Sequence, residues 1–140
     1  MKPDDFAARM RQHFDHLCTN LLTKLASGEE ATINITAEET LYVRFNGNRV
    51  RQNTDVEQIN LSLRLQSKGR TVEKNCTLGG QHKTDQPALT ALLEACRLEA
   101  SVLPVDPNQV PIENKGSSSE AFRGALLSPK ELVSAVVGAA

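Results

Sequence analysis

The chain has 140 residues, a formal net charge of −1 and 39% hydrophobic residues, which suits one domain long enough to bury its own core. The near-neutral charge argues against a nucleic-acid binder, because such proteins normally carry a basic patch. The three cysteines lie far apart without a CxxC pair, so we expect reduced thiols that pack as small hydrophobic groups. The sequence shows no signal peptide and no apolar run of about 20 residues, the length that spans a bilayer. We therefore expect a cytoplasmic protein without a nucleic-acid or membrane partner.

Residues 4–26 have the spacing of an amphipathic helix. Apolar side chains recur there at steps of three or four, which places them on one helix face. They are Phe6, Met10, Phe14, Leu17, Leu21 and Leu25. A strand is expected over residues 30–37, where apolar and polar residues alternate. We expect a turn at Ala37-Glu38-Glu39, followed by a second strand from Leu41.

Residues 41–65 carry the clearest strand pattern. In the second half of this stretch, aliphatic residues alternate with polar ones, which puts the two sets on opposite faces of a strand. The aliphatic set is Ile59, Leu61, Leu63 and Leu65, and the polar set is Asn60, Ser62, Arg64 and Gln66. Asn46-Gly47-Asn48 predicts a turn, because Asn and Gly tolerate positive φ. Gly69 predicts a hairpin turn into a strand over residues 71–78, and the inward charge of Lys74 marks that strand as a sheet edge or as a strand near its frayed end.

The second half of the chain predicts two further helices. One is expected to be capped by Thr84 or Asp85 and to end at Pro104. Residues 105–127 are rich in Pro, Gly and Ser and predict a linker. A capping box at 128–131 then begins a helix in residues 128–140. Because the chain stops soon after this helix start, we expect a truncated part of a longer protein; the alternative is a short docking helix.

This order of elements predicts the fold class. Strands joined by tight turns favour an antiparallel sheet, and helices on both sides of them in the sequence favour α+β. We expect a two-layer sandwich, with a mainly antiparallel sheet and the helices packed on one face, formed by residues 1–104. The polar face of the sheet is expected to be solvated or covered by another domain or subunit.

No catalytic constellation can be recognised from the residues alone. The sequence contains no HExxH, GxSxG, Walker-type or GxGxxG motif, and neither Cys18 nor Cys76 has a recognisable base partner. His13 and His16 lie three apart on the first helix, but a helix alone supplies no third metal ligand. They fit better as the polar border of the apolar stripe, and His82 is most simply an exposed loop residue.

The join between the central strands carries the most unusual polar cluster. Residues 44–53 have the sequence RFNGNRVRQN, which resembles the R-F-x-x-N-x-x-x-Q-N segment in the N-terminal domain of the TldD/PmbA family. The likeness continues through the alternating strand, the Gly69-Arg70 hairpin, the Leu- and Ala-rich helix and the Pro-rich crossing. It covers the chain from the first helix to about Pro111.

The resemblance implies the N-terminal, non-catalytic domain of a cytoplasmic two-domain metalloprotease, a family also named modulators of DNA gyrase. Its members form homo- or heterodimers with a TldD/PmbA-type paralogue and act on peptides or unfolded polypeptides. The family's zinc motif, HExxxH plus a distant Cys, lies after the matched region. This chain is therefore expected to hold no cofactor and to be inactive alone, with any zinc in the full-length protein or its partner.

The same resemblance assigns peptide-substrate binding to Arg44, Asn48, Arg49, Gln52 and Asn53. On residue types alone, this cluster fits a solvated sheet end equally well. The alternative function is a stand-alone peptide-binding or protein-interaction module without enzymatic activity. Such a module would take up an extended peptide at an exposed sheet edge, with residues 71–78 as the candidate edge and Lys74 counting against it.

Overall fold

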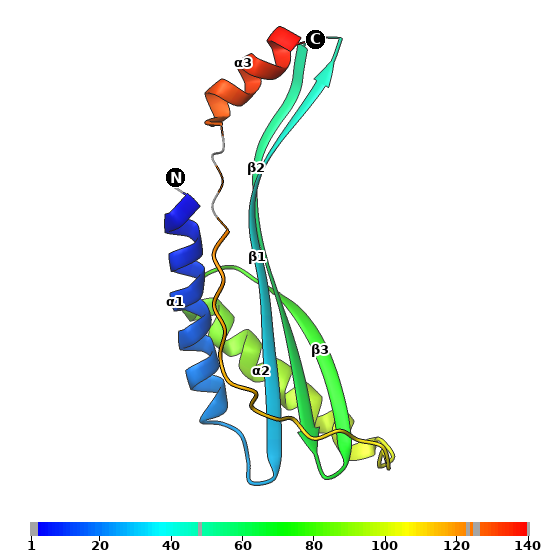
Figure 1. Ribbon diagram of the computed structural model, residues 1–140. Coiled ribbons are helices and arrows are strands. Elements are labelled where there is room, and N and C mark those ends of the chain that lie inside the picture. Colours follow the sequence, from blue (N-terminus) through cyan, green and yellow to red (C-terminus); the bar gives the residue numbers. More distant parts are fainter. Residues whose placement is uncertain (1–2, 48, 123, 125–126, 140) are drawn as a thin grey trace. The chain divides into compact units, whose positions relative to one another are not determined.

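The computed structural model describes residues 3–47, 49–122, 124 and 127–139 (Figure 1). Its elements are α1 (Pro3–Leu22), β1 (Glu29–Asn46), β2 (Arg49–Ser67), β3 (Arg70–Leu78), α2 (His82–Val102) and α3 (Pro129–Ala139). The strands form an antiparallel sheet in the order β1-β2-β3. With α2 packed on β3 and α1 packed on α2, the predicted α+β fold is confirmed.

The chain divides into two compact units. One comprises Met1–Glu38 and Gln58–Glu113, and we call it the core unit. The other comprises Glu39–Glu57 and Asn114–Ala140, and we call it the arm unit. Each of β1 and β2 is about twice the length of β3 and contributes residues to both units. Among the described residues, no helix has the length and apolarity needed to cross a membrane.

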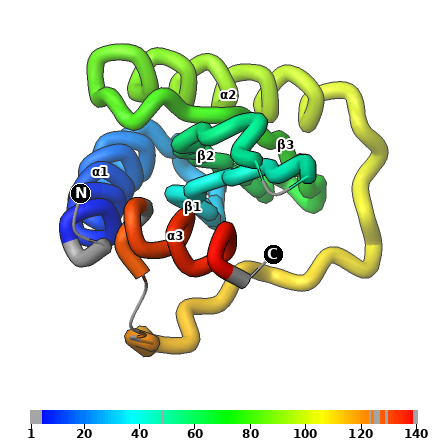
Figure 2. Tube along the Cα trace, turned by 90° about the horizontal axis from the view of Figure 1, so that it is seen from above, coloured from blue at the N-terminus to red at the C-terminus, as the bar shows by residue number. Residues whose placement is uncertain are grey.

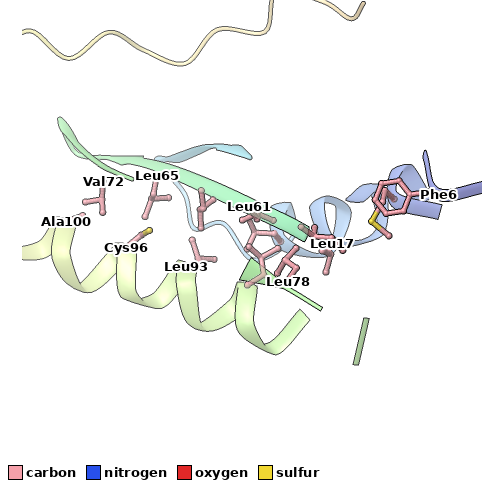
Figure 3. Close-up of a cluster of buried hydrophobic side chains, with 14 residues drawn as sticks. Phe6, Leu17, Leu61, Leu65, Val72, Leu78, Leu93, Cys96 and Ala100 are labelled. Carbon is pink, nitrogen blue, oxygen red and sulfur yellow. The ribbon is translucent and has the colours of Figure 1, made fainter. Parts of the chain in front are cut away.

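The core unit buries aliphatic side chains between its helices and one face of the sheet. Figure 2 shows α2 lying along the sheet with α1 beside it, and Figure 3 shows the buried side chains that fill the space. The fully buried ones come from α1, β2 and α2: Leu17, Leu21, Leu61, Leu63, Leu65, Leu89, Leu93 and Cys96. Burying each leucine contributes about 1.5–3 kcal/mol, so this cluster is the main source of stability.

The register of β2 on β3 places like side chains opposite each other. Leu61 lies opposite Cys76, and Leu65 lies opposite Val72. On the other face Arg64 lies opposite Glu73 and donates to it from Nε at 3.0 Å. This is the predicted division of β2 into an aliphatic and a polar face.

Two expectations for β3 are also confirmed. Its hairpin turn lies at Lys68 (φ 50°) and Gly69 (φ 75°), where a two-residue turn with positive φ matches the strand twist. The strand is an edge of the sheet. The charge of Lys74 faces α2, where it pairs with Glu99.

Three predicted boundaries are wrong. The turn expected at 37–39 is absent, because β1 continues from Glu29 to Asn46; residues 37–40 contain no Gly, Pro or Asn to reverse the chain. The first helix ends at Leu22 rather than residue 26, with turns following. The second helix begins at His82, with Gln81 rather than Thr84 or Asp85 at its N-cap position, and Gln81 makes no side-chain capping bond.

In the arm unit, β1 and β2 continue as a two-stranded ribbon. The predicted turn is present: β1 ends at Asn46, Gly47 has a φ of 53° and β2 begins at Arg49. The predicted capping box of α3 is confirmed, since the Glu131 N–H donates to Ser128 Oγ at 3.3 Å. In return, the Ser128 N–H donates to Glu131 Oε2 at 2.9 Å.

Candidate functional site

The tip of the ribbon forms a polar hollow of about 560 Å³ in the arm unit. It is lined by Arg44, Phe45, Asn46, Arg51 and Gln52. The tight turn at Gly47 brings the end of β1 beside the start of β2, so residues from both strands share one hollow. The four polar side chains are exposed and Phe45 is half-buried, which gives the hollow an apolar wall and polar surroundings.

The arginines of the ribbon are not engaged by any residue that the structure describes. Arg44, Arg49 and Arg51 make no hydrogen bond or ion pair with any described residue. A guanidinium carries five N–H donors in a planar fork that suits carbonyl and carboxylate oxygens. Gln52, by contrast, donates from Nε2 to Thr54 Oγ1 at 3.3 Å. The tip therefore presents many free donors and net positive charge.

The predicted binding residues are only partly brought together. Arg44 and Gln52 line the hollow, whereas Arg49 and Asn53 are exposed on β2 outside its lining. Asn48 lies outside the described residues. The hollow is also lined by Phe45, Asn46 and Arg51, which lie within the motif but were not among the predicted binding residues. Cross-strand proximity in a hairpin would have pointed to Arg51, because the turn fixes which residues face each other.

The ribbon also offers unpaired backbone. Because β1 is an edge of the sheet, its outer side has no strand partner among the described residues. The pairing of β3 with β2 covers only Ile59–Ser67 of β2, so the β2 part of the ribbon has an unpaired edge too. A ribbon with two such edges can accept another extended segment by main-chain hydrogen bonds.

A second polar cluster lies in the core unit, where α1 meets the start of α2. His13 is 3% exposed, and its Nε2 donates to Asp85 Oδ2 at 2.8 Å. The ring of His82 lies 4.4 Å from that of His13 and 4.2 Å from that of His16, measured between centroids. His82 is exposed as predicted, but it begins α2 rather than lying in a loop.

Asp85 organises the turn between β3 and α2. Its carboxylate accepts hydrogen bonds from the backbone N–H groups of Gly79, Gly80 and Gln81, at 2.9, 2.8 and 3.1 Å. Burial raises the pKa of Asp85, but the bonds from Gly79, His13, Thr84 and Gly80 outweigh it and leave the pKa below its ordinary value. Asp85 is therefore an anionic anchor that satisfies the N–H groups of this turn, whereas the sequence named it only as a candidate helix cap.

The described residues contain no group of three or more His, Cys, Asp or Glu side chains placed to hold a metal ion. His13 is bound to Asp85, and the ring of His82 lies tilted against those of His13 and His16, at interplanar angles of 39° and 51°. Cys96 is buried in the core, as expected of a small hydrophobic residue. Burial, followed by the charge of Asp15, raises the pKa of Cys18 to about 11, so this thiol is a poor nucleophile.

A hollow of about 440 Å³ in the core unit is lined by Lys68, Arg70 and Arg97, with Glu29. Arg97 binds the Glu29 carboxylate at 2.7 Å, and Arg70 donates to the Leu103 carbonyl at 2.7 Å. Its arginines are thus already engaged by protein groups, unlike those of the arm.

Comparison with protein-family models, curated proteins and solved structures finds no match to this chain.

Proposed function

We propose that this chain is the N-terminal, non-catalytic domain of a cytoplasmic TldD/PmbA-type metallopeptidase-family protein, and that its arm unit binds peptide substrate and takes part in dimer assembly. The observation that carries the proposal is the ribbon tip, where Arg44 and Arg51, which have no partner in the described part of the chain, adjoin Gln52 around one hollow. The motif at residues 44–53 supports it from the sequence side. In this proposal any zinc belongs to the longer protein or to its paralogue.

The arm has two ways to hold a polypeptide. An extended peptide adds to an open edge of the ribbon through main-chain hydrogen bonds, which give affinity without sequence preference. Arg44 and Arg51 donate to peptide carbonyl or carboxylate oxygens, and these bonds are about twice as strong as neutral ones because the donor is charged. Phe45 offers an apolar contact in the same hollow. Unfolded chains fit such a site better than folded ones, since their backbone groups are free.

The alternative proposal is a stand-alone interaction module that binds peptide at the edge of β3. One observation favours it: β3 has a strand neighbour on one side only. Two observations count against it. Lys74 is engaged with Glu99 on α2. The start of β3 is occupied, because Gln109 donates to Thr71 Oγ1 and the Asp106 N–H donates to the Gly69 carbonyl.

A binding assay separates these proposals. Fluorescence anisotropy with a labelled, unfolded polypeptide measures the dissociation constant, and amide NMR shifts map the contact. We expect the Arg44→Ala/Arg51→Ala double variant to bind at least roughly tenfold more weakly, with shifts at 41–54 in the wild type. The matched control is Arg64→Ala on β2, the strand that also carries Arg51. Arg64 is paired with Glu73, so this variant should bind as the wild type does.

If the double variant binds the polypeptide as tightly as the wild type, the arm unit does not bind it through these arginines. Shifts confined to residues 71–78 would instead favour the β3 edge and the stand-alone module. Light scattering of the chain, alone and mixed with a full-length TldD/PmbA-type protein, tests dimer assembly. Only monomer masses in both samples would reject that part of the proposal.

A further inference from the structure

All three histidines of the chain lie together in the core unit, with the His82 ring tilted by 39° to that of His13 and by 51° to that of His16, and we call this group the histidine stack. The ring of His82, the first residue of α2, lies 4.4 Å from that of His13 and 4.2 Å from that of His16. His13 and His16 are neighbours on α1, three residues apart. The stack therefore ties the start of α2 to α1 through ring contacts.

The three rings differ in how well they tolerate positive charge. A charged His13 is compensated by the buried Asp85 carboxylate, 2.8 Å away. His16 and His82 are exposed, and no described carboxylate is hydrogen-bonded to either ring. Positive charge on both His16 and His82 would place two like charges about 4 Å apart, without a described carboxylate hydrogen-bonded to either ring.

The charged groups that act on His82 come from two elements: His13 and His16 from α1, and Asp85 from α2. On β3, burial first and the charge of Asp85 second raise the pKa of Cys76, so this thiol stays neutral. Burial, followed by His13 and His16, lowers the pKa of His82 from 6.5, with Asp85 opposing only in part. The structure with the three rings in contact thus binds fewer protons than one in which His82 has separated from α1. The stabilisation by the ring contacts is therefore present above pH 6.5 and is lost as the pH falls through the lowered pKa of His82.

We propose that the histidine stack is a pH-sensitive clasp, which joins α2 to α1 near neutral pH and releases the first turn of α2 on acidification. Histidine is the side chain that titrates in this range. Two charges about 4 Å apart, screened as in water, shift a local equilibrium roughly fivefold. Asp85 remains ionised throughout, because its pKa lies below the ordinary 3.8, so the release begins at the rings and not at the anchored turn.

Amide hydrogen exchange of the intact chain tests the clasp. Protection factors, corrected for intrinsic exchange, are compared between about pH 7.5 and pH 5.5. We expect roughly fivefold lower protection for residues 82–86 at the lower pH, with little change for residues 93–100 in the buried part of the same helix. His82→Phe keeps a ring in the stack but cannot be protonated, so its protection at residues 82–86 should not depend on pH.

Either of two results overturns the proposal. One is pH-independent protection of residues 82–86 in the wild type. The other is the same loss of protection in His82→Phe, which would assign the effect to different groups. If His82→Phe does not fold, His16→Gln serves instead: it alters an exposed side chain and removes one of the two like charges. A loss of the wild-type size that persists in His16→Gln would equally reject the clasp.

Discussion

Replacing Asp85 by Asn should destabilise the core unit far more than a single surface change does. The Asp85 carboxylate is buried and accepts five hydrogen bonds, from the backbone of Gly79, Gly80 and Gln81 and from the side chains of Thr84 and His13. Asn has one acceptor oxygen, and its NH2 group points donors at donors. An NH2 group in place of Oδ2 loses the bonds from Gly80 and Gln81, and in place of Oδ1 it loses the bond from Gly79. Either way, N–H groups of the turn are left without partners.

The magnitude follows from the kind of bond lost. A hydrogen bond to a charged group contributes about 1.5–3 kcal/mol, and breaking a buried charged pair costs about 3–5 kcal/mol. Because the five bonds share one carboxylate, their losses do not add. We expect Asp85→Asn to lower the free energy of unfolding by about 3–4 kcal/mol.

Urea unfolding followed by circular dichroism at about pH 7 measures this loss, with an unchanged slope as the sign that the folded state is intact. Glu73→Gln is the matched control, because it removes an exposed carboxylate bound to Arg64 and Ser62 and should leave stability close to wild type. A loss in Asp85→Asn no larger than in this control would refute the reasoning. If Asp85→Asn fails to fold, Thr84→Ala, which removes one of the five bonds, should cost about 1 kcal/mol.

The pH dependence of the same variant gives an independent check. The folded pKa of Asp85 is depressed below its ordinary 3.8, so its stabilising effect is present above pH 3.8 and is lost as the pH falls through the folded pKa. The difference in stability between wild type and Asp85→Asn should therefore shrink below about pH 4. A difference that stays constant down to acid unfolding would contradict the assignment of charge to Asp85.

Two further substitutions test the packing by chemical unfolding. Gly69→Ala should cost about 2–3 kcal/mol, because φ is positive and the new Cβ would lie 2.9 Å from Val105 Cγ1. Gly47→Ala, also at positive φ but in open space, should cost about 1 kcal/mol. Equal losses would show that the Val105 contact does not matter. Leu63→Ala in the core should cost about 2–5 kcal/mol. Leu98 is 73% exposed, so Leu98→Ala should cost less than about 0.5 kcal/mol. Similar losses in the two variants would contradict the position of the core.

The sequence predicted those features that depend on neighbours along the chain. Alternation at residues 59–66 identified the buried and polar faces of β2, because a strand has a period of two. The turns at Gly47 and Gly69 and the capping box at Ser128 were likewise predicted from local backbone chemistry. The turn expected at residues 37–39 was wrong, although the half-buried positions of β1 keep the same parity from residue 29 to residue 45. The matching alternation of residue types was the available signal for one continuous strand.

Tertiary structure alone decided which distant side chains meet. His13 and Asp85 lie 72 positions apart, and nothing in either local sequence indicates the partner. Their contact depends on how α1 packs on α2, which is set by the summed burial of many aliphatic groups rather than by any local preference. The arm shows the opposite case. Because a tight turn fixes the register of its strands, Arg44 and Arg51 come together through local geometry, so that cluster was within reach of the sequence.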